Sequence, residues 1–146
     1  MASKEIAQEI EKTVGAYFEA CRMQDADAIS ACFAPGAVHY LPHLAPLHGG
    51  VTIGNAIVND LRNRGGRYFI DRIFTDDEQC AAAVEWSRTF HQGDRILRGF
   101  ELCEFDPASI LIREIRGYYA AAPQQEFARH ELVRFDYAGR RYKTVS

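Results

Sequence analysis

The spacing of apolar residues changes its period part-way along the chain, and this change constrains the fold more than any other feature of the sequence. Over residues 4–24, apolar side chains recur every three or four positions, which predicts an amphipathic helix with Ser3 as its N-cap. A second, short helix is expected to begin at Asp27 and to run through Phe33, since a Pro-Gly pair follows it. A third is expected after Thr52, with its apolar stripe turned inward.

Beyond the glycine pair at residues 65–66 the period falls from about 3.6 to 2, which is the alternation of a β-strand. Four apolar-rich runs with this alternation are separated by short loops of turn-forming residues: 68–74, 80–91, 95–105 and 110–119. An earlier strand is expected at residues 37–41, before a Pro- and Gly-rich loop. Helices first and long strands afterwards predict an α+β fold, in which the helices cover one face of a curved antiparallel sheet.

Composition and charge limit the partners that this chain can have. The 146 residues include 17 Lys+Arg and 20 Asp+Glu, which gives a formal charge of −3, and no long basic run is present. Nucleic acids and anionic membranes are therefore not expected as partners, because binding to either needs a basic surface. Acidic residues near the N-terminus interrupt any signal-peptide core, and no apolar run reaches membrane-spanning length, so a cytoplasmic location is expected.

The spacing of cysteines and histidines does not predict a metal site. The chain has four cysteines, Cys21, Cys32, Cys80 and Cys103. They lie far apart and form no C-x-x-C pair, which is typical of buried, small apolar side chains in a reducing compartment and not of a disulfide framework. His39, His43 and His48 lie in a strand and a loop, where nothing in their spacing ensures that they converge on a metal.

Six local phrases of the sequence occur in a characteristic order: YFEACRMQD at residues 17–25, DAISACFAPGAV at 27–38, PLHGG at 46–50, AVEWSR at 83–88, LRGFE at 97–101 and IREIRGYY at 112–119. In this order they resemble the SnoaL-like polyketide cyclase and ketosteroid isomerase group, within the nuclear-transport-factor-2-like superfamily. The resemblance implies a single domain over residues 1–120. The C-terminal extension, residues 121–146, is then expected to pack on the same domain or on a partner subunit.

The resemblance also implies a shape and a site. It implies a cone-shaped sheet of the nuclear-transport-factor-2-like or cystatin-like kind, with a ligand-binding hollow between the sheet and the helices and with no cofactor. Tyr17 stands where ketosteroid isomerases keep a tyrosine that donates a hydrogen bond to a developing enolate. Glu101 stands where they keep an acid that stays protonated in an apolar pocket. Their general base is replaced by Leu41, and the last aspartate of the related limonene-epoxide hydrolases by Gly117.

His39 is the candidate that replaces the missing general base. It lies two residues before Leu41 on the same predicted strand, so both side chains share the face that the resemblance assigns to the hollow. Of the two, only the imidazole can exchange a proton near neutral pH. The alternative is a structural histidine that bonds a backbone carbonyl or faces solvent. In the loop that follows, His43 could lean over the mouth of the hollow, while His48 is expected to be exposed.

Large side chains occupy the even positions of the run at residues 80–91, and they are expected to line the hollow. Among them Trp86 would form an apolar wall, and Arg88 would need an anionic partner, either Glu101 or a ligand carboxylate. The alternative is that this face packs against another subunit and that Arg88 reaches solvent. On the last predicted strand, Tyr119 is expected in the hollow and shares a face with Arg113.

These features predict a small, cofactor-independent enzyme of the isomerase, cyclase, dehydratase or hydrolase type, which acts by proton transfer on a small carbonyl compound. His39 would move the proton, while Tyr17 and protonated Glu101 would polarise the oxygen on which charge develops. The residues expected to contact the substrate are Leu41, His43, Trp86, Arg88 and Tyr119. The alternative is a non-catalytic module of the same fold that binds a small molecule or drives oligomerisation.

A homodimer is expected from the outer face of the predicted sheet. Alternation places five apolar side chains there: Ile96, Phe100, Leu102, Ile112 and Tyr118. An apolar area of this size needs cover from water, and closed two-fold pairing is the commonest way in which proteins provide it.

Overall fold

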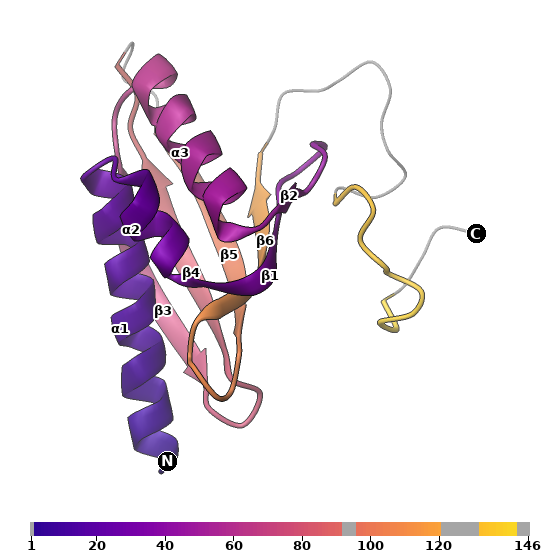
Figure 1. Ribbon diagram of the computed structural model, residues 1–146. Coiled ribbons are helices and arrows are strands. Elements are labelled where there is room, and N and C mark those ends of the chain that lie inside the picture. The colour runs from indigo at the N-terminus through magenta and orange to yellow at the C-terminus, as the bar shows by residue number, and fades with distance from the viewer. Residues whose placement is uncertain (1, 92–95, 121–131, 143–146) are drawn as a thin grey trace.

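The computed structural model of the protein describes residues 2–91, 96–120 and 132–142. In chain order the elements are α1 (Ser3–Arg22), α2 (Ala26–Ala31), β1 (Phe33–Tyr40), β2 (Leu47–His48), α3 (Gly50–Arg64), β3 (Tyr68–Asp76), β4 (Ala81–Arg88), β5 (Leu97–Phe105) and β6 (Ile112–Tyr119). Figure 1 shows α1, α2 and α3 on one side of a curved sheet. The predicted α+β fold is therefore confirmed. None of the described helices has the length and apolar character needed to cross a membrane.

The strands of the described chain form one sheet in the order β2-β1-β6-β5-β4-β3. Each neighbouring pair from β3 to β6 is antiparallel, as is the pair of β1 with β2. In contrast to the fully antiparallel sheet expected, β1 and β6 run parallel. Parallel neighbours need a long connection, and here α3 and the strands from β3 to β5 lie between them in the chain.

The main core lies between the helices and the sheet. α1 buries the stripe that its periodicity predicts, with Ile10 and Val14 at most 1% exposed. α3 adds Ile53 and Leu61, and the sheet adds Trp86 among other residues. Burying one such side chain contributes about 1.5–3 kcal/mol. α1 and α3 are therefore held firmly against the sheet, and the side chains that they turn toward it have defined positions.

The first two helices begin at other residues than predicted. α1 starts at Ser3 itself with Ala2 as its cap, and the Ser3 hydroxyl donates a hydrogen bond to the Asp77 carboxylate instead of capping the helix. α2 is capped two residues earlier than predicted, by Asp25, whose carboxylate accepts the Ala28 amide at 3.0 Å. At α1 the Ser3 hydroxyl is taken up by Asp77, and at α2 the same capping carboxylate is supplied two residues earlier by Asp25.

α3 and β1 also begin earlier than predicted. Gly49 caps α3, in place of the predicted Thr52, at a φ of +86° that glycine adopts without strain. α2 ends at Ala31, and β1 begins at Phe33 because Phe33 already pairs with β6. The Pro-Gly pair lies inside β1, at the irregularity between Phe33 and Val38, and does not end a helix.

The outer face of the sheet differs from the prediction at β6. Glu104 pairs with Glu114, and Phe105 pairs with Ile112, so Arg113 is an extra residue on β6. An extra residue shifts the alternation of side chains by one, so the part of β6 before Arg113 faces the opposite side from the one that simple alternation predicts. Ile112 is therefore fully buried although simple alternation predicts it outside, and Arg113 is exposed. The large apolar side chains that remain exposed are Phe69 and Phe74 on β3, Phe100 on β5, and Ile96 directly before β5.

The described part of the C-terminal extension, residues 132–142, packs on the same chain (Figure 1, yellow). Leu132, Phe135 and Tyr137 form a small apolar cluster against Tyr40 of β1 and Tyr118 of β6. The rings of Tyr40 and Phe135 meet edge to face, with their centroids 5.2 Å apart. This cluster covers part of the outer face of the sheet, and the rest of the extension lies outside the described residues.

Ion pairs tie the extension to β5 and β6. Arg140 lies 3.2 Å from the Glu104 carboxylate and 2.9 Å from that of Glu114. The same two carboxylates also pair with Arg116, which is 2% exposed. Both guanidiniums stack over the ring of Phe135, at 5.3 Å for Arg116 and 4.5 Å for Arg140. The two acids and two arginines thus balance in charge.

Candidate active site

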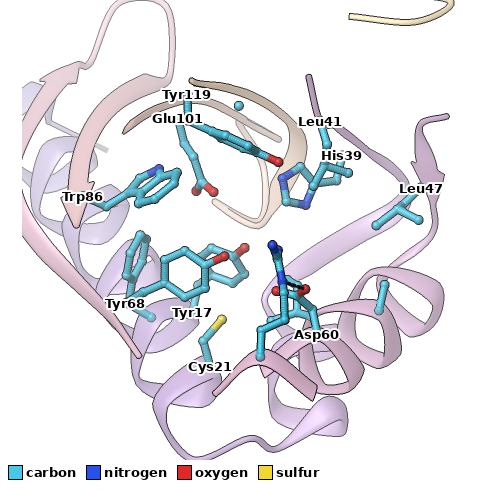
Figure 2. A pocket seen from close by; sticks show the side chains of 15 residues that line it. Tyr17, Cys21, His39, Leu41, Leu47, Asp60, Tyr68, Trp86, Glu101 and Tyr119 are labelled. Carbon is cyan, nitrogen blue, oxygen red and sulfur yellow. Dashed lines mark hydrogen bonds and ion pairs between the residues drawn. The ribbon is translucent and has the colours of Figure 1, made fainter. Parts of the chain in front are cut away.

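A cavity of about 160 Å³ lies between the sheet and helices α1 and α3. Several polar side chains line it: Tyr17, His39, Asp60, Arg64, Tyr68, Glu101 and Tyr119. Figure 2 shows that the labelled polar groups come from both layers and surround a common space. A cavity of about 150 Å³ is large enough for benzene, so this one accommodates a molecule of about one six-membered ring.

Six of the eight predicted site residues line this cavity: Tyr17, His39, Leu41, Trp86, Glu101 and Tyr119. The other two do not. His43 is half-buried in the loop after β1, where a turn joins the Leu44 amide to the Leu41 carbonyl at 3.3 Å. Arg88 is 1% exposed and lies behind the wall of the cavity. His48 is exposed on β2, as predicted.

Tyr17 is held at the cavity by edge-to-face packing. The centroid of its ring lies 5.4 Å from that of Phe18 and 5.5 Å from that of Phe33, and the residue is 4% exposed. Burial, and after it the nearby Glu101 carboxyl, raise the pKa of the phenol well above its usual value. Tyr17 therefore keeps its proton at neutral pH and can donate a hydrogen bond into the cavity.

His39 is buried on β1, and Figure 2 shows its ring turned toward the same space as the Glu101 carboxyl. Its Nδ1 atom has no hydrogen-bond partner among the residues that the structure describes. Burial lowers the pKa of the imidazole to about 4, because the charged form would lose its hydration. The ring is therefore neutral at pH 7, and a neutral imidazole has one nitrogen that can accept a proton.

Glu101 lies on β5, between Val84 of β4 and Gly117 of β6. It is 8% exposed, and its Oε2 atom has no hydrogen-bond partner in the described part of the chain. Burial raises the pKa of the carboxyl from its usual 4.5 to about 7. An ion pair with Arg88, the other possibility considered from the sequence, would lower it instead. Close to half of the Glu101 side chains are therefore protonated at neutral pH.

Arg88 is paired with Asp60 of α3, which corrects the expectation of a pair with Glu101. Its Nη1 atom donates to the Asp60 carboxylate and, at 2.9 Å, to the Tyr68 hydroxyl. Its Nη2 atom donates to the Gly65 carbonyl at 3.2 Å. Gly65, at a φ of +70°, ends α3 in a conformation that glycine adopts without strain. The end of α3 thus meets the end of β4, and this contact brings Asp60 to Arg88.

Aromatic rings form the apolar wall of the cavity. The ring of Trp86, which is 1% exposed, lies 5.2 Å from that of Tyr68 and 5.7 Å from that of Tyr119. Gly99 of β5 pairs with Trp86, and a Cβ atom there would come within 2.6 Å of the indole. The indole therefore occupies the space that a side chain at residue 99 would need, which favours glycine at that position.

Three polar residues of the cavity were not expected from the sequence: Asp60, Arg64 and Tyr68. Asp60 and Arg64 come one turn apart on α3, each at the edge of the inward stripe that holds Leu61. Residues four apart share a helix face. The spacing of Asp60 and Arg64 was therefore the signal in the sequence that could have placed both at the cavity. Tyr68 begins β3, separated by one residue from the glycine pair, and its position at the cavity depends on the turn that those glycines make.

Among the described residues, no group of three or more His, Cys, Asp or Glu side chains is placed to hold a metal ion. His39 lies in the cavity wall, whereas His48 is exposed on β2. The four cysteines are buried free thiols, as their spacing predicts. Of these, Cys21 lines the cavity.

No protein-family model and no curated protein matches this sequence significantly. A crystal structure from Methylobium petroleophilum PM1, of a protein of unknown function with a cystatin-like fold, is 39% identical to the chain. The match covers 95% of this chain and 93% of that one, with a TM-score of 0.85. At this identity and coverage the two proteins are members of one family.

More distant structures share the fold. An epoxide hydrolase from M. tuberculosis, described as LEH-like, is 21% identical over 77% of this chain and 84% of that one, with a TM-score of 0.63. A Catenulispora acidiphila protein with a ketosteroid isomerase-like fold, in complex with trimethylamine, is 15% identical over 74% and 85%, also at 0.63. Other structures with this fold are assigned to the ketosteroid isomerases and polyketide cyclases. The chain therefore belongs to the family of the Methylobium petroleophilum protein, and it has the cystatin-like fold that ketosteroid isomerase-like and nuclear-transport-factor-2-like structures share.

Proposed function

We propose that the protein is a cofactor-independent enzyme that moves a proton on a small carbonyl compound, as an isomerase, cyclase, dehydratase or hydrolase does. The observation that supports this most strongly is the convergence of Tyr17, His39 and Glu101, from α1, β1 and β5, on one small cavity. Two of these residues have a buried polar atom with no partner among the described residues. Folded proteins rarely bury such atoms unpaired, so their presence around a cavity favours a ligand that pairs with them.

Each of the three groups has a protonation state that suits a separate role. Tyr17, whose pKa is raised, keeps its proton and donates a hydrogen bond to the substrate oxygen. Glu101, with a pKa of about 7, donates a second hydrogen bond while it is protonated. Neutral His39 accepts the proton from the carbon next to the carbonyl. Two donors directed at one oxygen stabilise the negative charge that develops there.

The surroundings of these groups support the same role. Trp86 and Tyr119 keep water away from the reacting atoms, which strengthens each hydrogen bond to the developing charge. The fold is used by an LEH-like epoxide hydrolase and by an epoxide hydrolase/cyclase-like enzyme of pyran ring formation in salinomycin. These relatives favour an enzymatic use of the cavity over the alternative of a binding or oligomerisation module.

Hydrogen exchange at carbon tests the proposal even though the natural substrate is not identified. The protein is incubated in D₂O with cyclohexanone and with acetophenone, and the loss of their α-proton signals is followed by NMR. We expect faster exchange than in buffer alone. His39→Gln is expected to slow it by about two to four orders of magnitude, the usual contribution of a positioned acid or base. Tyr17→Phe is expected to slow it about a hundredfold, as loss of one oxyanion donor does.

His48→Gln is the matched control for His39→Gln, because His48 is an exposed histidine outside the cavity. This variant is expected to exchange at the wild-type rate. Exchange no faster than in buffer, or exchange that His39→Gln leaves unchanged, contradicts the proposed role. Saturable binding of the ketones without any exchange would favour the non-catalytic binding module instead.

A further inference from the structure

The α3 side of the cavity holds more positive charge than the proposed proton transfer uses. Asp60 accepts a hydrogen bond from Arg64 Nε at 2.7 Å and another from Arg88 Nη1. Burial alone would raise the pKa of Asp60, but these hydrogen bonds outweigh burial and hold it below its usual value. The Asp60 carboxylate is therefore ionised at neutral pH. Because both guanidiniums are always protonated, one negative charge is shared between two positive charges.

In the described wall of the cavity, no acid other than Asp60 is fully ionised at neutral pH. The remaining carboxyl among the lining residues is that of Glu101. Figure 2 shows Glu101 and Asp60 on different walls of the cavity, in agreement with their positions on β5 and α3. With Glu101 protonated, as the proposed function requires, the group of Asp60, Arg64 and Arg88 leaves one positive charge at the edge of the cavity.

The two arginines differ in their access to a ligand. Arg88 is 1% exposed and lies between the rings of Tyr68 and Phe90, at 5.0 Å and 4.7 Å from their centroids. Arg64 lines the cavity, and 59% of its side chain is exposed. Its Nε is bound to Asp60, while its Nη atoms make no hydrogen bond to another described residue. Asp60 and Arg88 therefore orient Arg64, and Arg64 has donors free for a ligand.

We propose that Arg64 binds a carboxylate of the substrate at the α3 end of the cavity, so that the substrate is a small oxo-carboxylic acid. This inference rests on the proposed function, in which the carbonyl oxygen of the same molecule lies against Tyr17 and Glu101. The planar edge of a guanidinium matches a carboxylate and forms charge-assisted hydrogen bonds with it. The volume of about 160 Å³ leaves room for one ring or a short chain between the two ends.

Benzoate and benzamide test the anion site without turnover, because they share a ring and nearly the same shape but differ in charge. Isothermal titration calorimetry at neutral pH and low salt is expected to show about tenfold tighter binding of benzoate, as a charge-assisted hydrogen bond provides. Arg64→Gln is expected to abolish this preference and to leave the affinity for benzamide unchanged. Arg62 is exposed on the same helix and lies outside the cavity. Arg62→Gln is therefore the matched control and should retain the preference.

Equal affinities of the wild type for benzoate and benzamide, or a preference that survives Arg64→Gln, overturn the inference. Its failure is distinguishable from failure of the proposed function. If the protein exchanges the α-protons of cyclohexanone but does not prefer benzoate, the inference fails and the function stands. If it prefers benzoate through Arg64 but exchanges neither cyclohexanone nor an oxocyclohexane carboxylate, the anion site stands and the function fails.

Discussion

Replacing Glu101 by glutamine is expected to raise the stability of the protein more at alkaline pH than at acidic pH. Burial raises the pKa of the Glu101 carboxyl from its usual 4.5 to about 7 in the folded protein, whereas the unfolded chain keeps the usual value. The folded state therefore favours the protonated form. The stability that this preference provides is complete below pH 4.5 and is lost as the pH rises through about 7.

The size of this loss follows from the difference between the two pKa values. One pH unit corresponds to about 1.4 kcal/mol, so ionisation of Glu101 by itself should remove about 3 kcal/mol from the free energy of unfolding between pH 4.5 and about pH 8. Glutamine has nearly the same shape as glutamate and no charge to desolvate, so E101Q should escape the loss. The effect is large, because a typical domain is stable by only about 5–15 kcal/mol.

Urea denaturation of wild type and E101Q near pH 4.5 and pH 8 measures this effect. The difference in free energy of unfolding between the two proteins is expected to grow by about 3 kcal/mol toward the higher pH. Titration of His39 affects both proteins alike and cancels in the difference. Glu78→Gln, in the exposed turn between β3 and β4, is the control and should show no such change. The same difference in free energy of unfolding at both pH values would refute the argument that burial raises the pKa of Glu101.

Three further predictions concern the rate, the packing and the assembly. Ketone exchange should follow a bell-shaped pH profile, with limbs near pH 4 for His39 and near pH 7 for Glu101; a rate that rises through pH 7 would make Glu101 the base. Gly99→Ala should destabilise the protein by about 1–3 kcal/mol, because the new Cβ meets the Trp86 indole, and an unchanged Tm would contradict this packing. Sedimentation at micromolar concentration should give twice the mass of one chain for wild type and a monomer for Phe100→Asp, since exposed phenylalanines lie along β3 and β5; a monomeric wild type would refute the dimer.

The packing of the helices on one face of the sheet could be predicted because each element buries one of its faces. The apolar stripe of α1, from Ile10 to Cys21, is buried as its period requires. The even residues of β4, including Val84 and Trp86, are likewise buried, and the odd ones are more exposed. Burial of this kind depends only on regular backbone geometry and on spacing within one element, and both can be read from the chain itself.

Periodicity was insufficient where the backbone departs from regular geometry. The extra residue at Arg113 turns Ile112 to the opposite face, and no residue type in that stretch signals a bulge. The pairing of Arg88 with Asp60 could not be predicted from the sequence for a related reason. It depends on how the end of α3 meets the end of β4, which involves residues far apart in the chain. Tyr17 and Glu101, in contrast, line the cavity that the resemblance to a known family led us to expect.

Trp86 is the only tryptophan of the chain, and it forms part of the cavity wall. Selective excitation of indole therefore reports on the candidate site and on no other part of the protein. Indole emission shifts with the polarity of its surroundings, so entry of a ligand or ionisation of nearby groups would alter its wavelength or intensity. The protein thus contains an intrinsic fluorescent probe, and candidate substrates can be screened on the unlabelled native chain before any turnover assay exists.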